Sequence, residues 1–244
     1  MCSSDLYRSS GPSAERMRIL TYNIHGGLGM DGRRSIARIG AVLCELRADL
    51  VGLQEVHQRL PQSGLKDQPR ALARATGMAC LFGPALTLGL GRYGNAVLSA
   101  APASRRQVHR LPGEGEPRAA LEVELEMAGR PLTLFCTHFG LSDAARGAQA
   151  SALAAAVRRA GRPVVVVGDL NAGPEAPELQ PLLAAGLGHA APPVEPTFPS
   201  DHPRHRIDYI LLSPELIGTE CRLISSLASD HLPVAADIRW ADRG

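Results

Sequence analysis

The feature that most constrains the fold is a succession of short β-favouring segments with few helical segments between them. Apolar and β-branched residues cluster in about ten such segments, which are bounded by Gly, Pro, Asn and Asp. The predicted strands are Met17–Ile24, Leu50–Val56, Cys80–Phe82, Asn95–Ser99, Arg105–Leu111, Ala119–Glu126, Pro131–His138, Pro163–Gly168, Arg206–Leu212, Glu220–Ser225 and Val234–Trp240. They do not alternate regularly with helices. The pattern therefore predicts an α/β fold of two packed, mostly antiparallel β-sheets flanked by helices.

Two segments indicate which strand faces are buried. Ala119–Glu126 alternates strictly between apolar and charged residues, so one face of this strand should contact water. Pro163–Gly168 reads PVVVVG, which is typical of a strand buried on both faces. Helical spacing predicts helices over Ser35–Leu46, Gln68–Thr76 and Ser142–Arg159, the last with Ser142 as its N-cap. We expect residues 173–203 to be mostly loop, with a short helix near Glu178–Ala185.

The length of 244 residues suits one large domain, which we expect to span residues 17–244. The Ser-rich residues 1–16 are expected to be a disordered or non-native tail. Cysteines without metal-ligand spacing, in apolar segments, indicate buried thiols and a cytoplasmic location. The sequence shows no signal peptide and no apolar run of about 18 residues that would cross a membrane. The net charge of +2 excludes a polycation or an acidic disordered tail.

Polar side chains occur repeatedly at the ends of the predicted strands. Loops on a rigid scaffold commonly build functional sites, so we expect these residues to share one rim. They are Asn23, Glu55, His138, Asp169, Asn171, Asp208, Asp230 and His231. Several carboxylates at one rim repel one another unless a cation offsets them. Oxygen ligands of this kind suit Mg²⁺ or Mn²⁺ rather than Zn²⁺.

Seven short motifs occur in the order found in the endonuclease/exonuclease/phosphatase superfamily, and the chain resembles that family over residues 17–240. The motifs are TYNIHGG at 21–27, LQEV at 53–56, YGNAVLS at 93–99, TH at 137–138, GDLN at 168–171, RIDYI at 206–210 and SDHLPV at 229–234. The resemblance implies the DNase I-like fold, a four-layered α/β sandwich. It also implies a metal-dependent phosphoric ester hydrolase.

The same resemblance assigns roles to individual residues. Glu55 is implied as the direct carboxylate ligand of the metal, with Asn23 and Asp230 beside it. Asp169 and Asn171 match the pair that handles the attacking water and a phosphate oxygen. Asp208 and His231 match an Asp–His pair, and His138 matches the second histidine of the DNase I and sphingomyelinase branches.

Four further residues are assigned to the substrate side. Asn95 matches an Asn that faces the phosphate in several branches of the family. Arg118 and Tyr93 could contact the substrate, although a surface arginine and a turn tyrosine are equally good interpretations. His25 stands where apurinic-site nucleases carry an Asp, which argues against a repair role.

Two divisions of labour remain open for hydrolysis. His231 could act as the general base, oriented by Asp208, while His138 protonates the leaving oxygen. Alternatively, Asp169 activates the water and His231 holds the phosphate as a cation. We favour the first because His138 is present.

The sequence predicts a Mg²⁺-dependent phosphoesterase acting on a phosphodiester, with a nucleic acid or a phospholipid headgroup as possible substrate. The alternatives are a nonspecific DNA nuclease and a catalytically idle phosphate-binding scaffold. No obligate protein partner is evident. The motifs of inositol polyphosphate 5-phosphatases are missing, and with one Trp and four Phe the chain has no aromatic wedge of the sphingomyelinase type.

Overall fold

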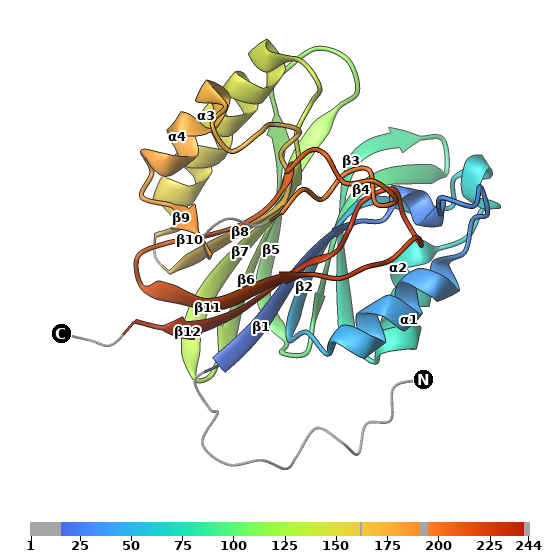
Figure 1. The fold of residues 1–244 in the computed structure, drawn as a ribbon, viewed down its shortest axis with the longest axis horizontal. Coiled ribbons are helices and arrows are strands. Elements are labelled where there is room, and N and C mark those ends of the chain that lie inside the picture. The colour runs from blue at the N-terminus through green and yellow to red at the C-terminus, as the bar shows by residue number, and fades with distance from the viewer. Residues whose placement is uncertain (1–15, 162, 191–194, 242–244) are drawn as a thin grey trace.

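The computed structural model describes residues 16–161, 163–190 and 195–241, which form two six-stranded β-sheets packed face to face (Figure 1). The predicted tail, apart from residue 16, lies outside the described residues. The first sheet has the order β11-β12-β1-β2-β4-β3. Its strands are β1 (Arg16–Asn23), β2 (Leu50–Gln58), β3 (Ala79–Leu88), β4 (Gly91–Ser99), β11 (Leu216–Leu223) and β12 (Val234–Trp240).

The second sheet is formed by one continuous stretch of the chain and has the order β5-β6-β7-β8-β10-β9. Its strands are β5 (Ala103–Leu111), β6 (Arg118–Met127), β7 (Arg130–His138), β8 (Val164–Asp169), β9 (Gly188–His189) and β10 (Asp208–Leu212). Each sheet contains one parallel pair, β1 with β2 and β7 with β8, and the other pairings are antiparallel. The prediction of mostly antiparallel sheets is confirmed.

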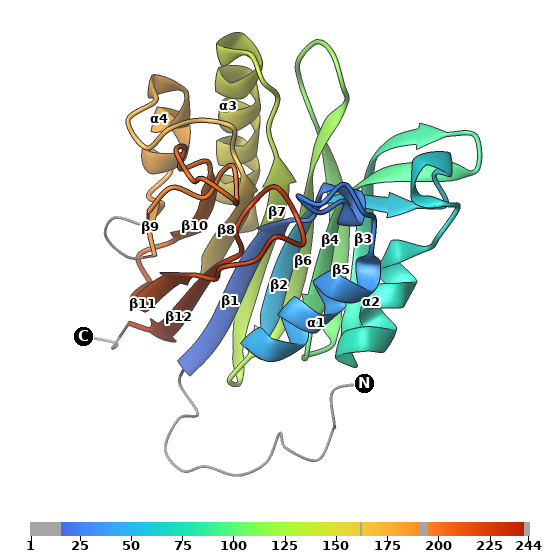
Figure 2. The same ribbon diagram turned by 45° about the vertical axis from the view of Figure 1, so that its right-hand side comes forward.

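Helices cover the outer face of each sheet, which completes four layers (Figure 2). Helices α1 (Ile36–Leu46) and α2 (Gln68–Thr76) pack on the first sheet, where Leu43 and Leu72 join its apolar cluster. Helices α3 (Asp143–Ala160) and α4 (Gln180–Leu183) pack on the second sheet. The Ser142 hydroxyl accepts a hydrogen bond from the Ala145 amide, so the predicted N-cap is confirmed.

Aliphatic side chains fill the space between the sheets, as the low aromatic content requires. The two sheets approach each other closely at Gly52 on β2. A Cβ at this position would lie 2.3 Å from Cγ2 of Val167, a distance that real contacts do not tolerate. Glycine at position 52 therefore lets β2 lie directly against β8.

Strands β3 and β4 are longer than the segments predicted from the sequence. Gly83 and Pro84 interrupt the apolar pattern, yet β3 continues past them to Leu88 through a register shift between Pro84 and Leu86. Proline is tolerated here because β3 is an edge strand, and the bulge removes the need for its missing amide. The β3–β4 hairpin extends beyond the sheet as a result (Figure 1).

Candidate active site

The polar residues at the strand ends gather at one end of the sandwich, as predicted. The parallel pairs bring the carboxyl ends of β1, β2, β7 and β8 to the same edge. Strands β10 and β12 are antiparallel to their neighbours, so they bring their first residues to that edge. The residues that meet there are Asn23, Glu55, His138, Asp169, Asn171, Asp208, Asp230 and His231.

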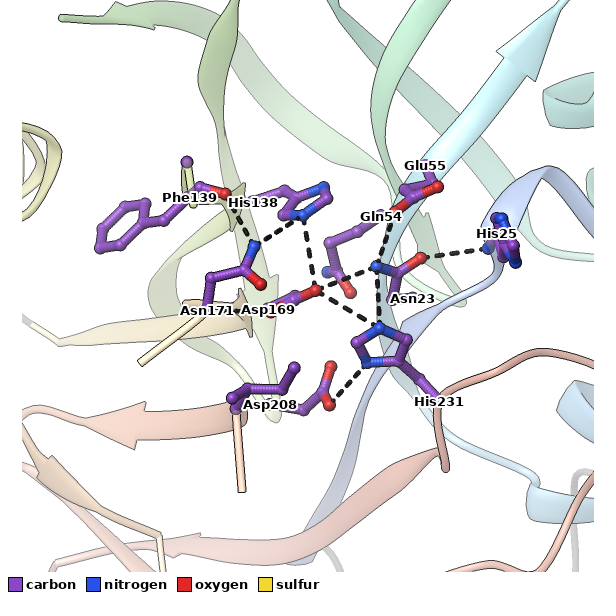
Figure 3. Close-up of polar contacts among 12 residues, drawn as sticks. Asn23, His25, Gln54, Glu55, His138, Phe139, Asp169, Asn171, Asp208 and His231 are labelled. Carbon is purple, nitrogen blue, oxygen red and sulfur yellow. Dashed lines mark hydrogen bonds and ion pairs between the residues drawn. The ribbon is translucent and has the colours of Figure 1, made fainter. Parts of the chain in front are cut away.

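Asp208 and His231 form a hydrogen-bonded pair in the site (Figure 3). Nδ1 of His231 lies 2.9 Å from Oδ2 of Asp208, and both residues are buried. Burial disfavours the charged ring, but the charge and the hydrogen bond of Asp208 outweigh it and raise the pKa of His231 to about 10. The Asp208 carboxylate therefore favours the protonated form of His231.

Asp169 lies on the other side of the His231 ring. Its Oδ2 is 3.6 Å from Nε2 of His231 and accepts a 3.0 Å hydrogen bond from the amide of Asn23. Burial, followed by the charge of Asp208, raises the pKa of Asp169 to about 7. This carboxyl group can therefore both take up and release a proton near neutral pH.

His138 is held between a cation and the Asp169–Asn171 turn. An Nη of Arg118 lies 2.9 Å from its Nδ1, while its Nε2 lies 3.4 Å from Oδ2 of Asp169 and 3.1 Å from Nδ2 of Asn171. Burial and the nearby positive charges hold the pKa of His138 well below its usual value. Arg118 also contacts the Tyr93 hydroxyl at 3.3 Å, and it is buried rather than exposed as a surface arginine would be.

Glu55 is turned towards the site by a bulge in β2. The pairing of β2 with β4 shifts register between Leu53 and Val56, and Glu55 has a φ of +56°. His25 and Asn171 also have positive φ values, of +46° and +49°. Such backbone strain in residues with side chains is concentrated at functional sites.

The amide of Asn23 connects the carboxylates of the two sheets. Its Nδ2 donates to Oε1 of Glu55 at 3.1 Å as well as to Asp169, and its Oδ1 accepts from the backbone amide of His25. The His25 ring turns to Asp230, with Nδ1 3.3 Å from Oδ2. That hydrogen bond raises the pKa of His25, and it lowers the pKa of Asp230 against the opposing effect of burial.

One group of described residues has the spacing to hold a metal ion, and two further carboxylates border the pocket. Asp169, Asp208 and His231 each offer a ligand atom within 4.8 Å of the others. However, His231 turns opposite nitrogens to the two carboxylates, which is the geometry of a hydrogen-bonded chain. Glu55 and Asp230 border an open pocket, carry only oxygen donors and fit a hard divalent cation better.

The pocket at this edge has a volume of about 490 Å³. It is bordered by nine of the predicted residues: His25, Glu55, Tyr93, Arg118, His138, Asp169, Asn171, Asp230 and His231. Asn23 and Asp208 lie buried behind them. Asn95 does not border the pocket, because its amide donates to the carbonyls of Ala119 and Cys136 and so connects the two sheets.

Four further residues of the site escaped the sequence prediction. The Phe198 ring lies 4.8 Å from that of His231, and the Thr197 hydroxyl donates to Asp208 at 2.6 Å. Both stand in the Pro-rich loop, where no periodicity marks them. Arg34 and His57 border the pocket and pack against Gly26. A Cβ at position 26 would lie 2.4 Å from the His57 ring. The paired glycines of the HGG segment could have indicated that neighbouring side chains pack closely against this turn.

The chain belongs to the endonuclease/exonuclease/phosphatase family, whose sequence model matches residues 20–231. It is 30% identical over 244 residues to the uncharacterised protein YbhP of Escherichia coli (strain K12), an alignment that covers 91% of this chain and 95% of YbhP. Enzymes of this family cleave phosphoester bonds and generally depend on a divalent metal.

Solved structures confirm the DNase I-like fold. An endonuclease/exonuclease/phosphatase from Beutenbergia cavernae DSM 12333 superimposes with a TM-score of 0.81 at 26% identity, covering 93% of this chain and 72% of that one. The mannosyl-6-phosphatase Bt3783 of Bacteroides thetaiotaomicron VPI-5482 gives 0.77 at 17% identity, covering 92% and 100%. No helix among the described residues is long and apolar enough to cross a membrane.

Proposed function

We propose that this protein is a Mg²⁺-dependent phosphoesterase that hydrolyses a phosphodiester, with Mn²⁺ as an alternative ion. The observation that carries the proposal is one continuous chain of contacts. It runs from Asp208 through His231 and Asp169 to Asn23 and Glu55, and it borders a pocket of about 490 Å³. A scaffold that only bound phosphate would not need two buried carboxylates around one imidazolium, because their burial is costly.

Glu55 and Asp230 would hold the metal, with Asn23 fixing the orientation of Glu55. When bound, Mg²⁺ supplies positive charge that stabilises the phosphoryl oxygens and the departing oxygen. The remaining chemistry falls to the side chains of this chain.

The charges of the site favour Asp169 over His231 as the general base. A base must lack its proton at the working pH, and the pKa of His231 is raised to about 10. The pKa of Asp169 is raised to about 7, which suits proton uptake from the attacking water. His231 then stays cationic and binds a phosphoryl oxygen, while Asp208 holds its orientation.

His138 acts as a hydrogen-bond donor rather than as a general acid. Its lowered pKa leaves it neutral, and the bond from Arg118 to Nδ1 puts the remaining ring proton on Nε2, which lies 3.4 Å from Oδ2 of Asp169. That N–H can hold the carboxyl group of Asp169 in position for the attacking water. Preorganised donors of this kind are effective because they need no reorientation during the reaction.

The pocket favours a small or lipid phosphodiester over DNA. A nuclease needs free basic groups along the backbone of its substrate. Of the basic residues that border this pocket, Arg34 donates to the carbonyls of His25 and Gly26, and Arg118 is paired with Glu116 and His138. Leucines supply much of the rest of the border.

The test is hydrolysis of bis(p-nitrophenyl) phosphate beside p-nitrophenyl phosphate, with Mg²⁺ or with a chelator. We expect diester cleavage that the chelator abolishes and that Glu55→Gln lowers by about 10²-fold or more. Glu215→Gln, on the loop before β11, is a control that keeps the activity.

If the enzyme prefers the monoester, the proposed substrate changes from a phosphodiester to a phosphomonoester. Absence of hydrolysis of either ester, together with absence of Mg²⁺ binding in calorimetry, would overturn the proposal. The idle scaffold would then be the better explanation.

A further inference from the structure

Large apolar side chains that are exposed to water are concentrated at the active-site end of the molecule. Of the seven in the described part of the chain, six stand at this end: Leu88 is the last residue of β3, and Met30, Leu65, Leu90, Leu141 and Leu227 stand on loops. Ile217, on β11, is the exception. Leu88, Leu90 and Leu141 are 57%, 88% and 76% exposed, which is a large cost in water for side chains without a partner.

The topology explains why these residues share one end. The loops after β1, β2, β3 and β7 all leave the sandwich where the catalytic residues lie, and so does the loop between β11 and β12 (Figure 2). Leu88 and Leu141 also border the catalytic pocket. Exposed apolar side chains thus stand on several loops at the same end as a polar phosphate site, and two of them border its pocket.

One part of this end of the molecule is basic as well as apolar. We call it the leucine–arginine lobe, and it consists of Arg59, Leu65, Lys66, Leu88, Leu90 and Arg92, all exposed. Its two loops touch, because a Cβ at Gly91 would lie 2.6 Å from Leu60 and 3.0 Å from the carbonyl of Arg59. Residues 59–66 and 86–92 contain three basic side chains and no acidic one.

We propose that the leucine–arginine lobe docks on the surface of an anionic lipid bilayer, and that the substrate is a phosphodiester headgroup presented there. This inference rests on the proposed phosphoesterase activity. Leucines would enter the acyl boundary while the lysine and arginines bind anionic headgroups, which is the division of labour at membrane interfaces. The pocket that Leu88 borders would then open directly towards the headgroups.

The arrangement fits a lipid surface better than a protein partner. The core of a protein interface is a contiguous apolar patch in which lysine is depleted. Here the leucines stand singly on several loops, alternate with basic residues and lie at the same end of the molecule as a polar opening. The chain needs no aromatic wedge for this purpose, because aliphatic side chains at loop tips serve the same end.

The test measures binding apart from catalysis. The full chain is sedimented with vesicles of phosphatidylcholine containing about 30 mol % phosphatidylglycerol, and with pure phosphatidylcholine vesicles. We expect binding to the anionic vesicles, lowered about 10-fold or more by Leu65→Ser with Leu90→Ser. Lys66→Gln with Arg92→Gln should lower it about 5-fold per charge.

Matched controls stand at the other end of the molecule. Ile217→Ser removes an exposed apolar side chain, and Arg158→Gln removes an exposed charge from α3; neither should alter vesicle binding. The lobe variants should retain hydrolysis of the soluble diester, because Leu65, Leu90, Lys66 and Arg92 do not border the pocket.

Each result is decisive. Vesicle binding that is absent, or that the lobe variants leave unchanged, overturns the docking proposal. A dimer in light scattering that these variants dissociate also overturns it, in favour of a second copy of the chain. Lobe-dependent vesicle binding without any diester hydrolysis would support docking and would refute the phosphoesterase proposal alone.

Discussion

Arg118 donates a hydrogen bond to Nδ1 of His138 across 2.9 Å. A guanidinium group has only donors, so Nδ1 is the bare nitrogen and the ring proton lies on Nε2. The buried cation therefore favours the Nε2–H tautomer of His138, and this N–H faces Oδ2 of Asp169 at 3.4 Å, beside Nδ2 of Asn171.

Replacing Arg118 should release this constraint. Arg118→Met should lower kcat about 10- to 100-fold, the range for a residue that orients a functional imidazole. The ¹⁵N shifts of the His138 ring report the tautomer directly, and we expect Nε2–H in the native protein and a mixture in the variant. Tyr93→Phe removes a contact of Arg118 but keeps the guanidinium, so the tautomer should survive. An Nδ1–H signal in the native protein would contradict this prediction.

The pH profile of kcat/KM should rise with a midpoint near 7. A carboxyl group whose pKa is raised to about 7 holds its proton below that pH and cannot accept another, so Asp169 gains activity as the pH rises. The profile should fall near pH 10, where His231 loses the charge that binds phosphate. In His231→Gln the falling limb should vanish. If His231 were the base, activity would instead keep rising up to about pH 10.

Asp169→Asn should lower kcat by about 10²- to 10⁴-fold, the range for a lost general base. The amide has nearly the same shape but cannot take a proton from water. Binding of inorganic phosphate, measured as competitive inhibition, should change far less. A variant that retained most of its turnover would remove Asp169 from the role of base.

His231→Gln should affect phosphate binding strongly. Loss of a charged hydrogen bond weakens binding about 10- to 100-fold, so the inhibition constant for inorganic phosphate should rise by that factor. Thr197→Val is a matched probe, because it removes a hydrogen bond to Asp208 but leaves the imidazolium in place. A large loss of turnover with phosphate binding intact would restore His231 as the base.

Two glycines should respond in opposite directions to alanine. Gly52→Ala places a Cβ 2.3 Å from Val167 between the sheets and should destabilise the fold by about 1–3 kcal/mol. Gly147, in the middle of α3, has no atom within 4 Å of its added Cβ, so Gly147→Ala should stabilise by up to about 1 kcal/mol. Urea unfolding midpoints measure both effects. Equal stability of the two variants would show that β2 can move away from β8.

Much of the fold was predictable because periodicity and capping act locally. Residues 68–76 form the predicted helix, Ser142 caps α3, and the run of valines at 164–167 is buried on both faces of the second sheet. The clustering of the strand-end residues also followed from the sequence, since parallel strands deliver their carboxyl ends to a common edge.

The directions of side chains were not predictable, because they depend on contacts between distant segments. Asn95 was expected to face the substrate, but the two carbonyls of the opposite sheet take its amide. From the sequence, Arg118 could equally have been a surface residue. In the structure it is enclosed between β4 and β7, where it contacts Tyr93 and His138. The choice between Asp169 and His231 turns on the burial of three charges together, which a linear pattern does not encode.

The pairing of β1 with β12 joins the first strand of the sandwich to the last. During synthesis, β1 can pair with β2 early, but it can pair with β12 only after the ribosome has produced that strand. The loop that leads into β12 carries Asp230 and His231, so the candidate site is completed by the same pairing that closes the sheet. A chain in which β12 is not yet paired would therefore hold Asn23, Glu55 and Asp169 without the imidazole that lies between Asp169 and Asp208.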